Sequence, residues 1–207
     1  MTHPTATLFT PAEAAVLTRL PLKVVNNAID KGTVATVAGT PRRYGDRLLD
    51  WRGLIALALE RRLADRFVPG LRREVFDALA DAPRDTLSLD GGFLKIDLRG
   101  PRRELAVAIR SLRRAKDLVV ADPEIMGGEP VFRGTRVQVH RIAALLEQGE
   151  TEADLLEGYP RLTEEMVRLA PFYAAAYPLR GRPRVQPSLG QAPVRQNRRR
   201  LLPMATA

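Results

Sequence analysis

The first thirty residues alternate between polar capping positions and short apolar runs that fit two helices. Thr10 at the N-cap, Pro11 at the first helical position and Glu13 closing a capping box predict a helix ending near Leu17. A second helix begins at about Pro21 and stops at Gly32. Its apolar positions are expected to be buried: Val24, Val25, Ala28 and Ile29. Its opposite face is polar: Lys23, Asn26, Asn27 and Asp30.

An alternating pattern after the second helix predicts a β-hairpin. Residues 34–37 form the first strand, residues 39–41 turn, and residues 42–44 return. The run FTPAEAAVLTRLPLKVVNNAIDKG, followed by this hairpin, resembles the winged helix-turn-helix of the MerR-like group. Asparagine and lysine on an exposed second helix suit base edges and phosphates in a major groove. The expected DNA-binding residues are Lys23, Asn26, Asn27, Lys31, Arg42 and Arg43. A module used only for packing or dimerisation has the same pattern and remains the alternative.

Two more helices support this unit. Asp50 caps a long helix that runs to about Phe67, and Trp51 at its start is assigned to the core rather than to base stacking. A shorter helix follows over residues 70–80. The apolar spacing of both helices indicates that they pack on the first two and complete a compact N-terminal unit.

A hairpin and a basic helix are predicted next. The apolar segments 87–89 and 93–98 enclose Asp90-Gly91-Gly92, which is typical of a tight reversal. Pro101 opens an amphipathic helix, and residues 118–121 are expected to form one sheet with the hairpins at 87–98 and 131–139. Leu105, Ala108, Ile109 and Leu112 of the helix are expected to face inward. Its arginines face outward, either plainly solvated or contacting phosphates: Arg102, Arg103, Arg110, Arg113 and Arg114.

The segment 122–177 combines a hairpin with three helices. Gly134 supplies the positive φ for a reversal between Val131-Phe132 and residues 137–139. A helix over 140–148 ends at Gly149, Thr151 and Asp154 form a capping box for the next, and Thr163 caps a third. A short helix, a turn and a longer helix make a helix-turn-helix pattern, which small helical bundles without nucleic acid also show.

This segment carries a specific resemblance. The run GGEPVFRGTRV, then a helix and GETEADLLEGYPRLTEEMV, closely resembles a family known as a domain of unknown function, over roughly residues 119–177. Longer members of that family resemble VapB-type antitoxins, which are encoded beside PIN-domain ribonuclease toxins. The resemblance implies that a PIN-domain ribonuclease and promoter DNA are the partners of this chain.

Charge and composition change sharply after Tyr177. Residues 180–207 contain seven arginines and no acid, whereas the rest of the chain has 26 basic and 24 acidic residues. Proline and glycine are frequent in the tail, which predicts a segment that is disordered on its own. Because a PIN-type nuclease clusters carboxylates around a metal, a tail guanidinium is expected to occupy the place of that metal. Contact of these arginines with DNA phosphates is the alternative. The expected toxin-binding residues are Phe172, Tyr173, Tyr177, Leu179, Arg180, Arg182, Arg184, Arg195 and Arg198.

Little in the chain points to catalysis. It contains no cysteine, and its two histidines, His3 and His140, are far apart; His140 is expected to pack or cap. The sequence has no P-loop, nucleophile-elbow or zincin motif. We therefore expect a protein that is not an enzyme and needs no cofactor or metal. The N-terminus lacks signal-peptide character and no apolar run reaches about 20 residues, so the expected location is the cytoplasm.

These patterns combine into an α+β chain that is mainly α. The predicted parts are a winged helix-turn-helix domain (1–82), a hairpin and basic helix that connect (83–121), a hairpin plus three-helix module (122–177) and a disordered basic tail (178–207). Exposed strand edges and two-fold operators predict a homodimer within a heterotetramer or larger complex. The favoured function is an antitoxin that represses its own promoter; a stand-alone transcription regulator and a pure interaction protein are the alternatives.

Overall fold

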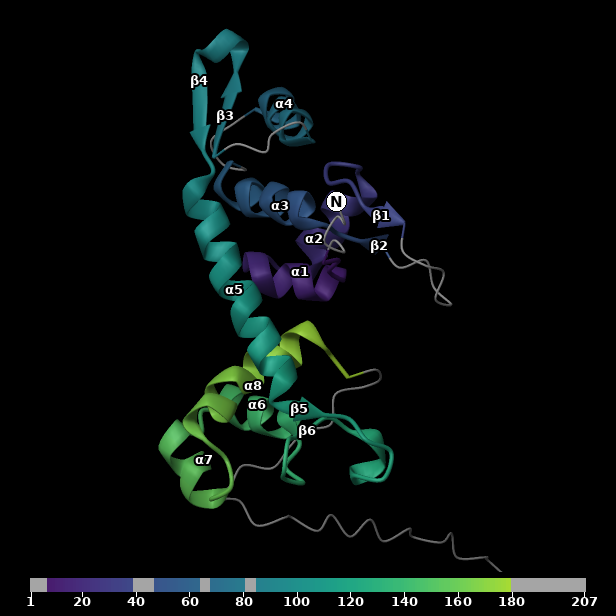
Figure 1. The fold of residues 1–207 in the computed structure, drawn as a ribbon, viewed down its shortest axis with the longest axis vertical. Helices are drawn as coiled ribbons and strands as arrows, with labels where there is room; N and C mark the ends of the chain where they lie inside the picture. The colour runs from purple at the N-terminus through teal and green to yellow at the C-terminus, as the bar shows by residue number, and fades with distance from the viewer. Residues whose placement is uncertain (1–6, 39–46, 64–67, 81–84, 180–207) are drawn as a thin grey trace, which may run out of the picture.

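The protein, described by a computed structural model over residues 7–38, 47–63, 68–80 and 85–179, is mainly helical with short two-stranded sheets (Figure 1). This confirms the predicted α+β, mainly α class. In chain order the N-terminal elements are α1 (Pro11–Thr18), α2 (Leu22–Asp30), β1 (Val37–Ala38), β2 (Arg47–Leu48), α3 (Trp51–Leu63), α4 (Pro69–Ala80), β3 (Thr86–Leu89), η1 (Asp90–Gly92), β4 (Leu94–Asp97) and α5 (Arg99–Asp117). The C-terminal elements are β5 (Val119–Val120), η2 (Met126–Gly128), β6 (Val131–Phe132), α6 (Val139–Glu147), α7 (Glu152–Gly158) and α8 (Glu164–Ala176).

The predicted helix caps are present. At the start of α1 the Thr10 hydroxyl accepts from the Glu13 amide at 3.2 Å, and the Glu13 carboxylate accepts from the Thr10 amide at 2.8 Å. Thr151 and Asp154 repeat this capping box before α7, and the Thr163 hydroxyl accepts from the Met166 amide before α8. These side chains satisfy amides that the first helical turn leaves without partners, so each sequence signal marks a true helix start.

The described parts of the chain contain three separate two-stranded sheets, and the segments predicted to share one sheet are divided between two of them, β3–β4 and β5–β6. β5 pairs with β6, as expected, with Val119 opposite Phe132. The β3–β4 hairpin pairs only with itself, so its placement in the same sheet was wrong. The 19-residue helix α5 separates the two sheets, and a helix of that length is about 28 Å long. Figure 1 shows β3–β4 at one end of α5 and β5–β6 at the other.

Buried residues form two clusters. The first contains Phe9, the inner faces of α1 to α4, the β3–β4 hairpin and the segment of α5 from Leu105 to Leu112. It also includes Ala176 from α8. The second is built by β5, β6, α6, α7 and α8, with Phe132, Ile142 and Leu145 almost fully buried. Helix α8 packs against α6 and α7 and also against α1 and α5, so it joins the two clusters. The apolar face predicted for α5 is confirmed, because Leu105, Ile109 and Leu112 are buried.

Helix α2 is less buried than its sequence predicted. Val25, Ala28 and Ile29 are in the core as expected, but Val24 is 38% exposed and Leu22 is 41% exposed. The reason is that α2 packs mainly on one neighbour, α1, so only a narrow stripe of it is covered. The strand predicted at 34–37 also begins later, at Val37, and Val34 is buried in the preceding loop. The predicted return strand at residues 42–44 lies outside the described residues.

Within the described residues, no helix is both long enough and apolar enough to cross a bilayer.

Candidate nucleic-acid and partner surfaces

The free face of α2 gathers the side chains that were predicted to contact DNA. Lys23, Asn27 and Lys31 are exposed and Asn26 is half-buried. Among the described residues, none of these four side chains has a hydrogen-bond or ion-pair partner. Leu22 and Val24 lie exposed beside them. The face therefore combines amide and ammonium donors with small apolar surfaces, the kinds of group that meet base edges, phosphates and thymine methyls.

The β1–β2 pair is fixed to the end of this helix. Arg47, at the start of β2, donates to the carboxylate of Asp30 at the end of α2. Phe9 and Leu49 exchange two backbone hydrogen bonds of 2.8 Å each, which join the segment before α1 to the segment after β2. These contacts set the position of the hairpin relative to α2. Arg42 and Arg43, predicted to contact DNA from the hairpin, lie outside the described residues.

The basic face of α5 is exposed, but some of its arginines have partners. Arg114 makes two hydrogen bonds, of 2.9 and 2.7 Å, to the carboxylate of Glu165 in α8. This pairing lowers the pKa of Glu165 and raises the pKa of Arg114. Arg102 lies 3.2 Å from Asp85. Arg114 and Arg102 thus help to hold neighbouring segments, while Arg103, Arg110 and Arg113 have no carboxylate partner among the described residues.

Tyr177, the residue that follows α8, is held by three elements. Its hydroxyl donates to the Glu13 carboxylate of α1, and its ring lies 5.4 Å from the ammonium of Lys116 in α5. His140 of α6 donates through Nε2 to the Tyr177 carbonyl at 2.8 Å. Burial and the bond to Glu13 raise the pKa of Tyr177 well above its usual range. These contacts fix the point at which the C-terminal tail leaves the described structure.

The other predicted toxin-binding aromatics are also engaged within this chain. The Tyr173 ring packs edge-on against His140 at 6.1 Å, and burial raises the pKa of its phenol. Phe172 packs against the first buried cluster, whereas Leu179 is 55% exposed. Of the apolar residues expected to anchor a partner, Leu179 is therefore the most accessible. Arg180, Arg182, Arg184, Arg195 and Arg198 lie outside the described residues.

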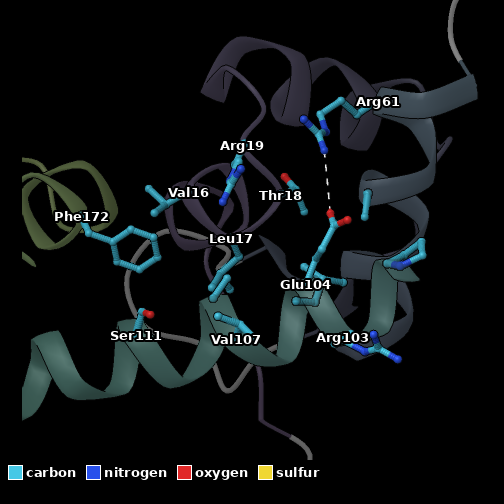
Figure 2. Close-up of a pocket in the computed structure, with 14 residues that line it drawn as sticks. Val16, Leu17, Thr18, Arg19, Arg61, Arg103, Glu104, Val107, Ser111 and Phe172 are labelled. Carbon is cyan, nitrogen blue, oxygen red and sulfur yellow. Dashed lines mark ion pairs between the residues drawn. The ribbon is translucent and has the colours of Figure 1, made fainter. Parts of the chain in front are cut away.

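Phe172 also lines a cleft between α1, α3, α5 and α8. The cleft has a volume of about 490 Å³ and an apolar floor that includes Leu17, Leu105 and Ala108. Figure 2 shows the Phe172 ring pointing toward Val16 and Leu17, with Arg61 reaching Glu104 across the opening. That ion pair is 3.9 Å long, and Arg62 pairs with the same carboxylate at 2.5 Å. Glu104, the only carboxylate among the described residues that line this cleft, is thus already bound by two arginines.

Charge is distributed unevenly between the two ends of the chain. Residues 1–118 contain 21 Lys and Arg against 14 Asp and Glu, a net charge of +7. Residues 119–174 contain 5 basic and 10 acidic residues, a net charge of −5. The near-neutral total of the chain before the tail conceals this difference. A net negative module is repelled by the phosphate backbone, so its helix-turn-helix pattern is the poorer candidate for contacting DNA.

Comparison with known proteins agrees with the resemblance seen in the sequence. Residues 119–174 match the family described as a protein of unknown function, DUF433. The uncharacterized protein y4eO of Sinorhizobium fredii (strain NBRC 101917 / NGR234) is 32% identical over 209 residues, which cover 95% of this chain and 93% of that protein. The chain belongs to the y4eO family. Because the match extends along both proteins, the family includes the N-terminal helices as well as the DUF433 segment.

A solved structure is also similar in part. The X-ray crystal structure of Rv2018 from Mycobacterium tuberculosis aligns with 78% of this chain and 95% of that chain, at 16% identity and a TM-score of 0.31. A TM-score this low does not show that the two proteins share a fold. The DUF433 match at residues 119–174 confirms the family recognised in that segment, and the y4eO match is a separate relationship that also covers the N-terminal half.

The contacts around Tyr177 were not predicted. Glu13 was recognised only as the residue that closes a capping box, but its second carboxylate oxygen accepts from Tyr177, 164 residues away in sequence. No local pattern signals a pair of that separation. A weak signal existed in the tyrosine that follows the three alanines at the end of this helix, since a tyrosine there has an apolar ring to bury and a hydroxyl to satisfy.

Proposed function

We propose that this protein is an antitoxin that binds its own promoter through α2 and neutralises a PIN-domain ribonuclease through its C-terminal tail. The observation that carries the DNA-binding part is the free face of α2. It presents Lys23, Asn26, Asn27 and Lys31 without partners among the described residues, on a half of the chain with a net charge of +7. Amide and ammonium donors that have no partner, on a half of the chain with a net positive charge, favour a nucleic-acid ligand over an apolar protein partner.

The arrangement of α1, α2 and the β1–β2 pair supports a winged helix-turn-helix interpretation. The two helices are joined by a short turn, and the hairpin is attached to the end of α2 by the Arg47–Asp30 pair. In such an arrangement the second helix enters the major groove while the hairpin contacts the backbone. Two copies in a homodimer place their α2 helices about 34 Å apart along an inverted repeat.

The antitoxin part is supported by the family resemblance and by the tail. Seven arginines without any acid follow Leu179, immediately after a point that three elements hold in place. A nuclease whose carboxylates bind divalent metal offers an acidic cleft, and a guanidinium forms bidentate hydrogen bonds with carboxylates. The tail arginines are proposed to enter that cleft and exclude the metal and the RNA.

A second candidate is a stand-alone transcription regulator. The observation that favours it is that Phe172, Tyr173 and Tyr177 pack against other residues of this chain. Side chains that already make intramolecular contacts are less available to bind a toxin. In that case the tail strengthens binding to DNA phosphates. A cognate nuclease that the full chain inhibits at stoichiometric concentration distinguishes the antitoxin from this regulator.

The experiment that tests DNA binding replaces Asn26 and Asn27 with alanine in the full chain. The ligand is the DNA upstream of its own reading frame, compared with a random duplex of equal length. Each lost bidentate base contact is expected to cost about 1–3 kcal/mol on the upstream DNA and little on random DNA. Equal losses on both duplexes contradict base reading by α2.

A matched pair of lysine variants separates a phosphate contact made by α2 from a general effect of net charge. Lys23→Ala removes an ammonium on α2, and Lys95→Ala removes an exposed ammonium on β4. Only the first is expected to reduce the slope of log affinity against log salt concentration, by about one unit. Equal slopes for both variants indicate that binding depends on overall charge.

A further inference from the structure

A second cavity lies between the segment before α1, the N-terminus of α3 and the middle of α5. Its volume is about 600 Å³, which is within the range of roughly 300–1,000 Å³ typical of small-molecule sites. Phe9, Trp51, Ala106 and Ile109 form its apolar part. Phe9 and Ile109 belong to the buried core, and Trp51 packs partly against it. The tryptophan assigned to the core by its sequence therefore has one side on the core and another on this cavity.

Three arginines surround the same cavity. Arg52 comes from the first turn of α3, and Arg110 and Arg113 come from successive turns of α5. Within the described residues none of the three has a carboxylate within ion-pair distance, and only Arg113 has a polar partner, the Thr7 hydroxyl at 3.5 Å. Unpaired cations that converge on one cavity from two helices favour an anionic ligand.

The one acid among the described lining residues, Asp50, forms no ion pair with these arginines. Asp50 uses one carboxylate oxygen to accept from the Gly53 amide at 2.9 Å, and so caps α3. The first turn of α3 also directs backbone amides toward this end of the helix, where the helix dipole is positive. The dipole adds to the positive potential of the arginines.

The aromatic and apolar part of the cavity specifies the ligand further. A bare anion gains nothing from Trp51, Phe9 and Ile109, whereas a planar ring can stack on an indole. The backbone of a DNA duplex offers phosphates, but its bases are stacked inside the helix. A free molecule that carries a planar ring and a phosphate matches both halves of the lining.

We propose that this cavity binds a phosphorylated aromatic small molecule of the nucleoside mono- or diphosphate class. Its ring lies against Trp51, and its phosphate lies between Arg110 and Arg113 near Arg52. None of the described residues that line the site belongs to α2, so its occupancy is a property additional to the proposed DNA-binding function. The N-terminus of α3 directly follows β2, so a bound ligand contacts the segment that carries the hairpin.

The chain contains one tryptophan, so its fluorescence reports directly on this cavity. The experiment titrates the full chain with AMP, ADP, adenosine and inorganic phosphate and follows Trp51 emission. Saturable quenching by AMP or ADP is expected, with adenosine and phosphate each at least tenfold weaker. Absence of quenching by both nucleotides up to millimolar concentration, together with absence of heat in calorimetry, overturns the proposal.

Variants identify where the ligand binds. Arg110→Ala combined with Arg113→Ala is expected to weaken AMP binding at least tenfold, while Arg103→Ala, an exposed arginine of the same helix outside this cavity, leaves it unchanged. All three side chains are exposed, and circular dichroism verifies that each variant is folded. Equal affinity of the double variant and the wild type overturns the assignment of the phosphate site.

Two controls separate this inference from other outcomes. The Asn26→Ala, Asn27→Ala protein is expected to bind AMP normally even where DNA binding is lost. Failure of the DNA-binding proposal can therefore be distinguished from failure of the nucleotide-binding proposal. Phosphate that quenches as well as AMP indicates a simple anion site and contradicts the role of Trp51. Single-stranded DNA that binds far more tightly than AMP, through the same arginines, indicates a nucleic-acid surface and likewise overturns the small-molecule assignment.

Discussion

Helices α2 and α8 are each the second helix of a helix–turn–helix pattern, but they differ in how many other helices they pack against. α2 packs mainly on α1 and keeps Lys23, Asn27 and Lys31 exposed. α8 packs against α1, α5, α6 and α7, and the tyrosines near its C-terminal end are tied to Glu13 and His140. A motif that looks the same in sequence is thus an open surface in one half and a structural junction in the other.

Charge sharpens the contrast. The α2 half carries a net +7 and the DUF433 segment a net −5, so the first half is the better candidate surface for a polyanion and the second the poorer one. Helical periodicity alone does not distinguish the two, because a buried junction and a DNA-reading helix both need one apolar stripe. Packing partners and local charge together separate a recognition helix from a scaffold helix.

The largest expected effect concerns the tail that follows the junction. Deleting residues 178–207 is expected to abolish inhibition of the proposed PIN-domain nuclease partner, because truncating one buried charge pair costs about 2–5 kcal/mol and several arginines are removed. Binding to upstream DNA is expected to persist, since α2 remains. The measurement pairs an RNA-cleavage assay with a DNA-binding assay on the same truncated protein.

A truncated protein that still neutralises the nuclease and loses only DNA affinity contradicts the tail assignment. That result places the arginines on DNA phosphates instead. A charge-preserving control replaces the arginines at 180, 182 and 184 with lysine. Lysine keeps the charge but cannot form a bidentate pair, so partial loss of inhibition by this variant indicates that guanidinium geometry matters.

The second prediction tests the difference in burial between the surroundings of α8 and the exposed face of α2. Leu145→Ala in α6, at a fully buried site beside α8, is expected to lower the free energy of unfolding by about 2–5 kcal/mol. Val24→Ala on the exposed face of α2 is the matched control and is expected to change it by less than about 0.5 kcal/mol. Chemical denaturation followed by circular dichroism measures both. Similar losses at the two sites mean that α2 is covered in solution.

The sequence predicted local features well. Caps at Thr10, Asp50, Thr151 and Thr163 and the positive-φ reversal at Gly134 are each determined by a few neighbouring residues, and all are present. Pairings between distant segments were predicted less well. The β3–β4 hairpin was placed in a sheet with β5 because apolar alternation identifies a strand but not its partner.

The prediction for α2 failed for a related reason. Val24 is apolar and lies next to Val25 in the helix, so periodicity placed both in the core. Which of the two is covered depends on the number of neighbouring helices, and α2 has few. Under the proposed DNA-binding function, the exposed Val24 and Leu22 beside Asn26 would supply apolar contacts to the bases.

The third prediction tests the junction at Tyr177. Tyr177→Phe removes the hydroxyl that donates to Glu13 and leaves a largely buried carboxylate oxygen without that donor. A loss of about 1–3 kcal/mol in the free energy of unfolding is expected, because an unsatisfied buried acceptor keeps its desolvation penalty. Lys116→Ala, which removes a cation 3.9 Å from the same carboxylate, serves as the second arm of a double-mutant cycle. Additive losses in that cycle contradict a shared Glu13 centre.

The smallest expected effect is the pH dependence of the contact between α5 and α8. The hydrogen bonds from Arg114 hold the pKa of the Glu165 carboxyl below its usual range in the folded protein. A depressed folded-state pKa stabilises the fold above the unfolded-state pKa, near 4.5, and this contribution disappears as pH falls through the folded value. Glu165→Gln is therefore expected to flatten the loss of stability below pH 4.5, measured by thermal unfolding across an acid series. Glu164→Gln, one residue earlier and exposed, is the matched control and is expected to leave the acid profile almost unchanged. Because the pair lies on the surface, salt screens it, and the difference between the variants should shrink at high ionic strength. A difference that is insensitive to salt contradicts an exposed ion pair as its cause.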